Sequence, residues 1–187
     1  MSENYDFLYL QGGVELLEDY LLSGDLYRAI NGAAPPGAPA FPSLTPSGLL
    51  LAQQRLASQS DLSSSAQAVL AEFNRLRAQW RTAWEKKVLK DLTARLTQWG
   101  AFLEEYRSQR AENAGRYAYE VRLRVMIDLL AQALPELPAE IQNRVTMLDT
   151  VLQANLQPGG FIWQPELQEA FPALRFAYLY ASLKKAP

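Results

Sequence analysis

The longest regular pattern in the sequence is a row of apolar side chains between residues 62 and 106. Its members are three or four positions apart, about 3.7 on average, which is the spacing that keeps a row on one side of a nearly straight α-helix. The row consists of Leu62, Ala66, Val69, Phe73, Leu76, Trp80, Trp84, Val88, Leu92, Leu96, Trp99, Leu103 and Tyr106. It predicts one long helix over about residues 61–113, with Asp61 as its N-cap.

The length of this helix limits how the chain can fold. A straight helix of about 50 residues spans about 75 Å, whereas a compact domain of this size is only about 40 Å across. We therefore expect either a bend, which we place near Gly100, or an elongated molecule. In an elongated molecule the first half of the row must be covered by the N-terminal helices or by a second chain. The row does not keep a seven-residue repeat, so it favours a helical bundle over a coiled coil.

Two further helices are predicted after the long one. Apolar positions at helical spacing cover residues 116–134 and 138–156, and the turn between them contains Pro135 and Pro138. Because the two helices are similar in length and the turn is short, we expect an antiparallel hairpin. It should fold back along the second half of the long helix.

The N-terminal part predicts a helical arm interrupted by a linker. A first helix is expected over about Val14–Ile30, after Gly12 and Gly13. Residues 33–46 contain five prolines, which predicts an extended internal linker that Phe41 and Leu44 pin to the bundle. Thr45 and Pro46 then resemble an N-cap and a first helical residue, so a short helix should run to about Ser58.

The tail, residues 157–187, is rich in aromatic side chains and contains Pro165 and Pro172. Alternate apolar positions from Leu174 to Tyr180 resemble a strand, but the sequence offers no evident partner strand. We expect the tail to cap one end of the bundle. Together these patterns predict a single all-α domain over residues 1–187: a helical bundle on one long central helix, with a hairpin, an N-terminal arm and an aromatic C-terminal cap.

The sequence contains neither cysteine nor histidine. This excludes disulfides, thiol nucleophiles, histidine general bases and the usual zinc ligand sets. Ser182 and Lys185 have the spacing of a Ser–Lys dyad, but that pattern is common by chance. We therefore predict no catalytic residues, no cofactor and no metal site, and favour a protein that is not an enzyme.

The net charge of −2 hides an uneven distribution. Residues 1–61 hold seven acidic and two basic side chains, whereas residues 62–134 hold twelve basic and eight acidic ones. The basic side chains concentrate in residues 75–95, where they could follow a phosphate backbone. The tryptophans of that segment belong to the apolar row, however, and the chain is acidic overall. We interpret the segment as a solvated helix face and do not expect nucleic-acid binding.

Two groups of residues are candidates for a binding role. The first half of the long row could meet a partner, either a second copy in a homodimer or another protein, through Leu62, Val69, Phe73, Leu76 and Trp80. Alternatively, the tail could cover an apolar ligand pocket lined by Trp163, Phe171, Arg175 and Tyr178. In that pocket Arg175 would anchor an acidic group, with Arg122 and Arg124 as further anchors.

The sequence therefore predicts a non-enzymatic interaction or scaffold protein. The alternative is a regulatory helical bundle that binds a small molecule under the tail. No apolar stretch reaches the length of a membrane span, and the acidic start lacks the basic region of a signal peptide. We therefore expect a cytoplasmic protein.

Overall fold

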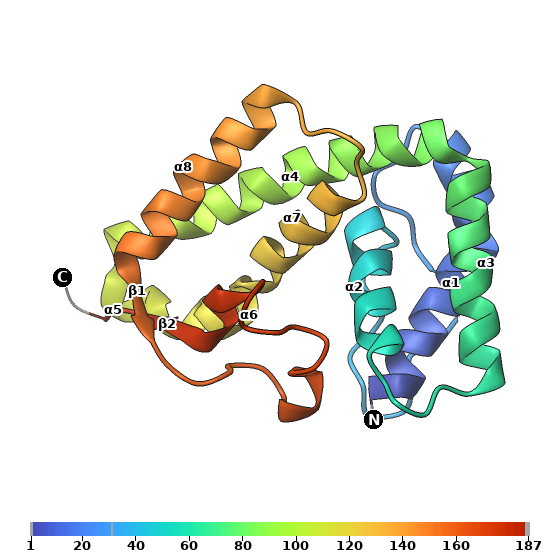
Figure 1. Cartoon of the computed structure of the whole chain (residues 1–187), viewed down its shortest axis with the longest axis horizontal. Helices are drawn as coiled ribbons and strands as arrows, with labels where there is room; N and C mark the ends of the chain where they lie inside the picture. Colours follow the sequence, from blue (N-terminus) through green and yellow to red (C-terminus); the bar gives the residue numbers. More distant parts are fainter. Residues whose placement is uncertain (1, 31, 186–187) are drawn as a thin grey trace. The chain divides into compact units, whose positions relative to one another are not determined.

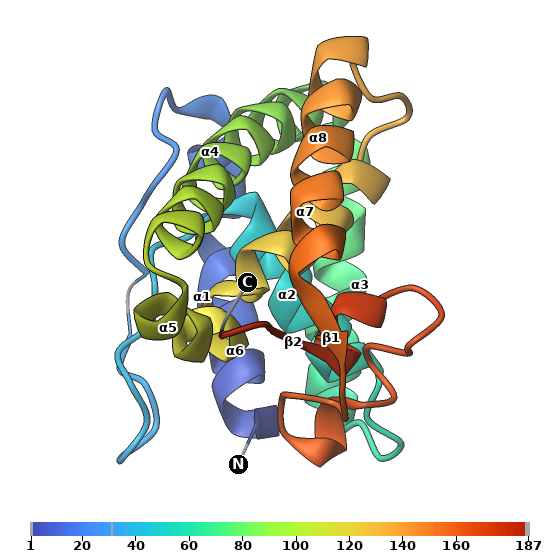
Figure 2. The ribbon, with the colours of Figure 1, turned by 90° about the vertical axis from the view of Figure 1, so that its left-hand side faces the viewer.

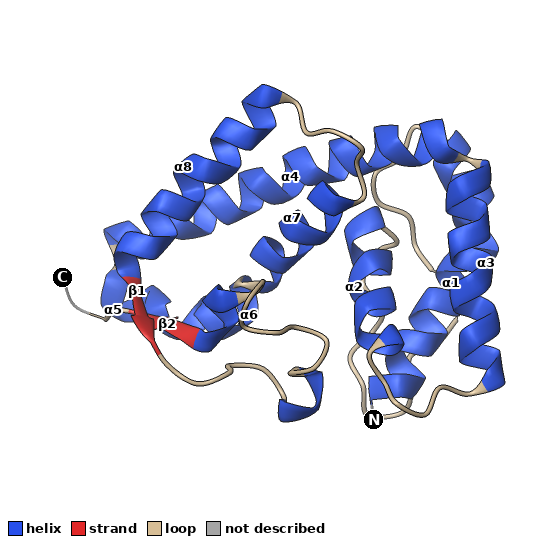
Figure 3. Ribbon diagram, viewed as in Figure 1, coloured by secondary structure: helices blue, strands red, loops and turns tan. Residues whose placement is uncertain are grey.

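The computed structural model describes residues 2–30 and 32–185, with side chains from Tyr5 onward. These residues are mostly helical and contain one short two-stranded sheet (Figure 3), which confirms the predicted all-α class. None of the described helices is both long and apolar enough to cross a membrane. The chain forms two compact units, which divide between Asp91 and Leu92 and are described separately. Residues 186 and 187 of the predicted tail lie outside the described residues.

The first unit contains α1 (Ser2–Leu22), α2 (Pro46–Ala57), α3 (Ser64–Gln79) and the beginning of α4 (Arg81–Ser108). In Figure 1 these are the blue, cyan and green helices, and α1 packs against both α2 and α3. Their inward-facing side chains form one apolar core. Its fully buried members include Leu10, Leu17, Tyr20, Leu49, Leu56, Phe73 and Val88.

The short helix α2 begins as the sequence predicts. The Thr45 side chain accepts a hydrogen bond of 3.1 Å from the Gly48 N–H, and Pro46 occupies the first helical position. The Ser47 N–H donates to Asp91 Oδ2 at 2.7 Å. Asp91 belongs to α4 and is buried, so a distant carboxylate completes the N-terminus of α2.

The first helix differs from the prediction, which placed it at Val14–Ile30. It runs from Ser2 to Leu22, and Gly12 and Gly13 lie inside it rather than before it. Gly13 faces Leu49 of α2 so closely that an added Cβ would collide with the leucine side chain. The glycine therefore serves close helix packing, and the sequence signal for a helix start was wrong.

The proline-rich linker, residues 33–46, contains no helix before α2. The Leu44 N–H donates to the Arg28 carbonyl at 2.7 Å, which joins the two ends of the connection. The Phe41 ring packs on Tyr5 and Tyr9 of α1, with ring centroids 5.1 and 5.8 Å away. Phe41 and Leu44 therefore attach the linker to α1 and α2 as predicted.

The predicted continuous helix over residues 61–113 is interrupted. The backbone leaves the helical region at Trp80 (φ −104°, ψ 33°), and α3 and α4 meet there at an angle (Figure 1). Gly100, where we expected the bend, lies inside α4 and faces Leu148. The N-cap also differs, because Ser63 rather than Asp61 accepts a hydrogen bond from the helix, donated by the Ala66 N–H at 3.1 Å.

The second unit contains the rest of α4 and the remaining elements. Short helical turns follow α4: α5 (Arg110–Asn113), the 3₁₀ turn η1 (Ala114–Arg116) and α6 (Tyr117–Glu120). Next come α7 (Arg122–Gln132) and α8 (Ala139–Asn155). The tail adds β1 (Leu156–Pro158), the 3₁₀ turns η2 (Pro165–Leu167) and η3 (Ala177–Tyr180), and β2 (Ala181–Leu183).

The hairpin lies where the sequence predicts it. Helices α7 and α8 run in opposite directions in Figure 1, and the Arg124 guanidinium of α7 binds the Asp149 carboxylate of α8. The hairpin also contacts the second half of α4, since Arg144 donates to Thr97 Oγ1 at 3.0 Å. One difference is that residues 116–134 form two helices, α6 and α7, rather than one.

The tail contains a strand with a partner that the sequence analysis missed. β1 continues directly from the end of α8 (Figure 2) and pairs antiparallel with β2, with Gln157 opposite Ser182. The Tyr106 hydroxyl of α4 donates to the Lys184 carbonyl at 2.7 Å and holds the segment beyond β2. Residues 174–180, whose alternation resembled a strand, form a turn and η3 instead.

Candidate binding groove at the bend between α3 and α4

A groove of about 600 Å³ lies in the first unit where α3 bends into α4. It is open to solvent along one side, and the C-terminal end of α1 forms its opposite wall. All of its lining residues belong to the first unit. They are Leu21, Leu22, Ser23, Gly24, Gln79, Trp80, Arg81, Thr82, Ala83, Lys86, Lys87 and Lys90.

Lysines of α4 close the end of α1. Lys87 Nζ donates to the Ser23 carbonyl at 2.9 Å and to the Asp25 carbonyl, and Lys90 Nζ donates to the Gly24 carbonyl at 2.8 Å. These three carbonyls follow Leu22, the last residue of α1, so the two ammonium groups hold the segment that leaves the helix. These contacts fix the wall of the groove.

The groove is strongly basic. Arg81, Lys86, Lys87 and Lys90 line it, and none of the lining residues is acidic. Arg81 forms an ion pair with Glu85 at 2.8 Å. Burial, and after it the like charge of Lys90, lower the pKa of the Lys87 ammonium. Lys86 is exposed, and no hydrogen bond or ion pair joins it to the described part of the chain.

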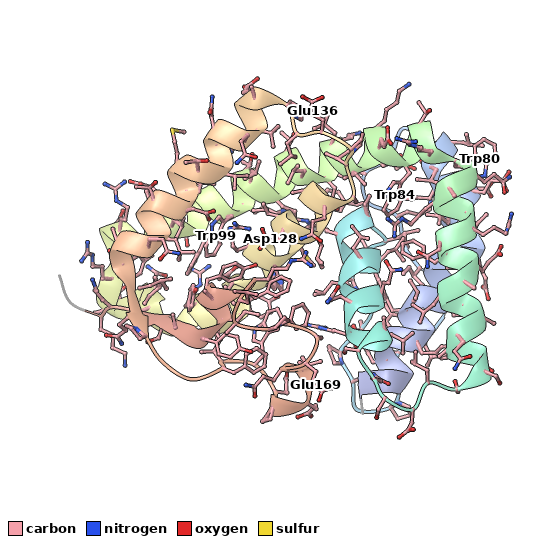
Figure 4. All side chains as sticks on the ribbon, viewed as in Figure 1. Trp80, Trp84, Trp99, Asp128, Glu136 and Glu169 are labelled. Atoms are coloured by element: carbon pink, nitrogen blue, oxygen red, sulfur yellow. The ribbon has the colours of Figure 1, made fainter. Side chains whose placement is uncertain are left out.

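An apolar surface lies beside the positive charges. Leu22, the last residue of α1, is 59% exposed, which is high for a large aliphatic side chain. Trp80 is half-buried at the bend (Figure 4), and its indole N–H is shielded from solvent without an acceptor among the described residues. Leu21 and Ala83 complete this part of the lining. The lining of the groove thus combines apolar side chains with the cations of α4.

Among the described residues, the groove lining contains two hydroxyl groups and no carboxylate. Its hydroxyl groups are those of Ser23 and Thr82, and the Ser23 hydroxyl donates to the Tyr20 carbonyl at 2.8 Å. No lining carboxylate could act as a general base. Within residues 2–30 and 32–185, no three acidic side chains come together as a possible metal site.

The residues of the predicted ligand pocket pack largely against one another. The ring of Phe171 lies between Trp163 and Phe176, with centroids 5.1 and 5.2 Å away, and Phe176 contacts Tyr178. The Trp163 indole donates to the Ala118 carbonyl at 2.9 Å. The aromatic side chains of the tail therefore fill the space between them, as in a packed cap. Arg175, the expected anchor, is exposed, with its guanidinium 4.6 Å from the ring centroid of Phe176.

A buried polar network ties the tail to the hairpin instead. The Arg124 guanidinium donates to both Asp149 oxygens at 2.7 and 2.8 Å and to Asp128 Oδ1 at 2.6 Å. The Tyr178 hydroxyl donates to Asp128 Oδ2 at 2.5 Å, and the Tyr117 hydroxyl donates to the Tyr178 carbonyl. Figure 4 shows Asp128 within this unit.

Two groups of this network, Tyr178 and Arg124, have raised pKa values. Burial, and then the neighbouring Asp128 charge, raise the pKa of the Tyr178 hydroxyl well above its ordinary value, so it remains a donor. Burial lowers the pKa of the Arg124 guanidinium, but its hydrogen bonds and the two carboxylates outweigh burial and raise the pKa overall. The sequence analysis named Arg124 as a ligand anchor, whereas its donors bind Asp128 and Asp149.

In the structure, some residues of the predicted partner interface are buried and others are half-buried. Phe73 is fully buried and Leu76 is buried in the first unit, so neither offers a free surface. Leu62, Val69 and Trp80 are half-buried. Of the two explanations for the apolar row, cover by the N-terminal helices holds for Phe73 and Leu76, which therefore give a homodimer no surface.

Of the groove residues, the sequence analysis named only Trp80 as a candidate for binding. The signal for the others was present: the basic side chains of residues 75–95 include every cation of the groove. Leu22 could not be recognised, because its exposure depends on where α1 ends.

We compared the chain with protein-family models, with curated proteins and with solved structures, and none of the three comparisons gave a match.

Proposed function

We propose that this chain is a non-enzymatic interaction protein that binds another protein through the groove between α1 and the α3–α4 bend. The observation that supports this most is the exposed Leu22 side chain beside the cations of the groove. Leu22 is not isolated, because Leu21, Trp80 and Ala83 also line the groove. An apolar patch surrounded by polar groups is a common feature of protein-binding surfaces.

The residue inventory also favours binding over catalysis. The chain has no cysteine and no histidine, and no acidic side chain lines the groove. The hydroxyl of Ser23 donates to the Tyr20 carbonyl, and the Lys87 ammonium 3.4 Å away donates to that hydroxyl and to the Ser23 and Asp25 carbonyls. Such a surface can recognise a partner by shape and charge without changing it chemically.

Site-specific photo-crosslinking tests this proposal. A photoreactive amino acid is placed at Leu22, and in a second sample at Met147, which is similarly exposed (64%) but lies on α8. Both proteins are irradiated in extract of the source organism, and adducts are resolved by mass. We expect an adduct of defined mass from position 22 only, and its loss when Lys86→Glu is added.

Three results would count against the proposal: no adduct from position 22, equal adducts from both positions, or adducts that do not respond to Lys86→Glu. An adduct of twice the chain mass of 21.0 kDa would identify the partner as a second copy. Light scattering would then give a dimer that Leu22→Ser dissociates. A monomer without adducts would leave the groove without a protein partner and end the proposal.

A further inference from the structure

We propose that the groove receives an acidic peptide segment that carries one large apolar residue between its carboxylates. This inference rests on the proposed function and specifies the chemistry of the partner. It follows from the arrangement of the cations on α4, from the small residue among them and from the position of Leu22.

The cations occupy one face of a helix. Ala83, Lys86, Lys87 and Lys90 follow one another at spacings of three, one and three residues, which places them on the same side of α4. Lys86 and Lys90 are one turn apart, so their side chains are neighbours. An amphipathic helix of a bundle carries apolar residues at such positions, whereas α4 carries three positive charges there.

The charge of this face is only partly neutralised. Glu85 pairs with Arg81. Lys87 and Lys90 bind backbone carbonyls, which are dipoles and not full charges, and the charge of Asp25 also acts on Lys87. Lys86 is exposed and offers its donors to solvent. A surface with this excess of positive charge attracts carboxylates and repels a basic partner. The surrounding chain has a net charge of −2, so the positive charge is a local feature of the groove.

The apolar part of the lining requires more than charge from the partner. Ala83, Trp80 and Leu22 line the groove together with Lys86 and Lys87, and Leu22 is exposed. One leucine or aromatic side chain from the partner would cover Leu22 and remove both from water. An acidic segment without such a side chain would leave Leu22 exposed.

Other anionic occupants fit the groove less well. Trp80 is the only aromatic lining residue and is half-buried, so consecutive bases of a single strand would lack stacking platforms. A small-molecule site encloses most of its ligand, whereas this groove is open along one side. An extended or helical peptide can use an open groove, because the rest of the partner continues beyond it.

Selection from a library of random 12-residue peptides displayed on phage tests the inference. The targets are the full chain, the groove variant Lys86→Glu/Lys90→Glu, and the control variant Arg107→Glu/Lys185→Glu. The control changes the net charge equally at two exposed positions outside the groove. Urea unfolding first establishes that all targets are folded, and Leu22→Ser provides a second groove variant without a change of charge.

We expect the full chain and the control to enrich peptides with several Asp or Glu residues around one Leu, Phe or Trp. Selected peptides, measured by fluorescence anisotropy, should bind the groove variant about tenfold more weakly and Leu22→Ser about threefold more weakly. Affinity should fall when NaCl is raised, because Arg81, Lys86 and Lys90 are exposed.

The inference is overturned if enriched peptides are neutral or basic, if the groove variant enriches the same peptides, or if nothing is enriched. It is also overturned if a twenty-residue oligothymidylate or vesicles of anionic phospholipid bind the chain, and lose binding in the groove variant, while acidic peptides do not bind. In these cases a charge-dependent adduct at position 22 would still support the proposed function, which is protein binding at the groove. Absence of that adduct would contradict both the proposed function and the inference of an acidic peptide.

Discussion

The Ser47 N–H donates a hydrogen bond of 2.7 Å to the buried Asp91 carboxylate, which joins the first turn of α2 to α4. The two residues are 44 positions apart. A carboxylate at a helix N-terminus meets unpaired N–H groups and the positive end of the helix dipole. This single contact therefore completes a helix and positions it against another.

Removal of the Asp91 carboxylate should destabilise the first unit. Asp91→Ala leaves the buried Ser47 N–H without this acceptor, so we expect a loss of about 2 kcal/mol in the free energy of unfolding. Asp91→Asn keeps an acceptor oxygen but loses the charge, and should cost about 1 kcal/mol. Urea unfolding followed by circular dichroism measures both. Equal stability of Asp91→Ala and the unchanged protein would show that the contact contributes nothing.

Two glycines of the first unit should respond in opposite ways to alanine. At Gly13 the new Cβ would collide with the Leu49 side chain, so we expect Gly13→Ala to cost about 2 kcal/mol. At Gly24 no atom lies within 4 Å of the new Cβ. Gly24→Ala should therefore be neutral or stabilise by about 0.5 kcal/mol through the unfolded chain. Thermal unfolding compares the two, and a similar loss from both would contradict the packing role of Gly13.

Asp6 should make stability depend on pH. Burial raises the pKa of its carboxyl from 3.8 to about 6 in the folded chain, although Arg55 lies 3.7 Å away and lowers it. Between these values the folded chain binds the proton more tightly than the unfolded chain, so stability falls as pH rises from about 4 to about 6. At 1.36 kcal/mol per pKa unit, the loss is at most about 3 kcal/mol.

The variant Asp6→Asn lacks this proton and should lack this loss. The difference in free energy of unfolding between Asp6→Asn and the unchanged protein should increase between pH 4 and pH 7 and be constant above pH 7. Urea unfolding at several pH values gives the difference, and carbon NMR of the Asp6 carboxyl should give a midpoint near pH 6. A difference that is independent of pH would refute the raised pKa.

The Arg124 network should behave as a unit. Asp149→Ala leaves the buried Arg124 guanidinium with half of its ion pairs, and we expect a loss of about 2 kcal/mol, because Asp149 itself is one-third exposed. Arg124→Met combined with Asp149→Leu should cost less than the sum of the single changes. As a matched control, Arg175→Ala should cost less than about 0.5 kcal/mol. Additive losses in urea unfolding would mean that the residues act independently.

Local chemistry made part of the fold predictable. Thr45 and Pro46 predict the start of α2, because the effects of an N-cap hydroxyl and of a proline at the first helical position extend over only a few residues. Apolar spacing locates α8 within one residue of each predicted end. Phe41 could be assigned to the surface of the bundle because an aromatic side chain in a proline-rich linker needs cover.

Features that depend on distant residues were not predictable in this way. Neither proline nor glycine marks the bend at Trp80, and the prediction of a bend at Gly100 was wrong because that glycine lies inside the regular helix α4. Gly13 serves contact with Leu49. The strand at 181–183 was missed because its partner follows directly after a helix.

In the candidate site, too, local features were predictable and features that depend on distant residues were not. The lysines of α4 were visible as a basic segment, but only the fold places the end of α1 against them. The exposure of Leu22 follows from the position of that end. Sequence alone could therefore supply the charge of the groove but not its apolar part.

The buried indoles of Trp84 and Trp99 have a practical consequence. Neither N–H has an acceptor among the described residues, and an indole that is shielded from water and free of hydrogen bonds fluoresces at a short wavelength. Trp84 belongs to the first unit and Trp99 to the second. Each unit thus carries an intrinsic optical probe, and variants that keep one tryptophan would reveal whether the two units melt together or in turn.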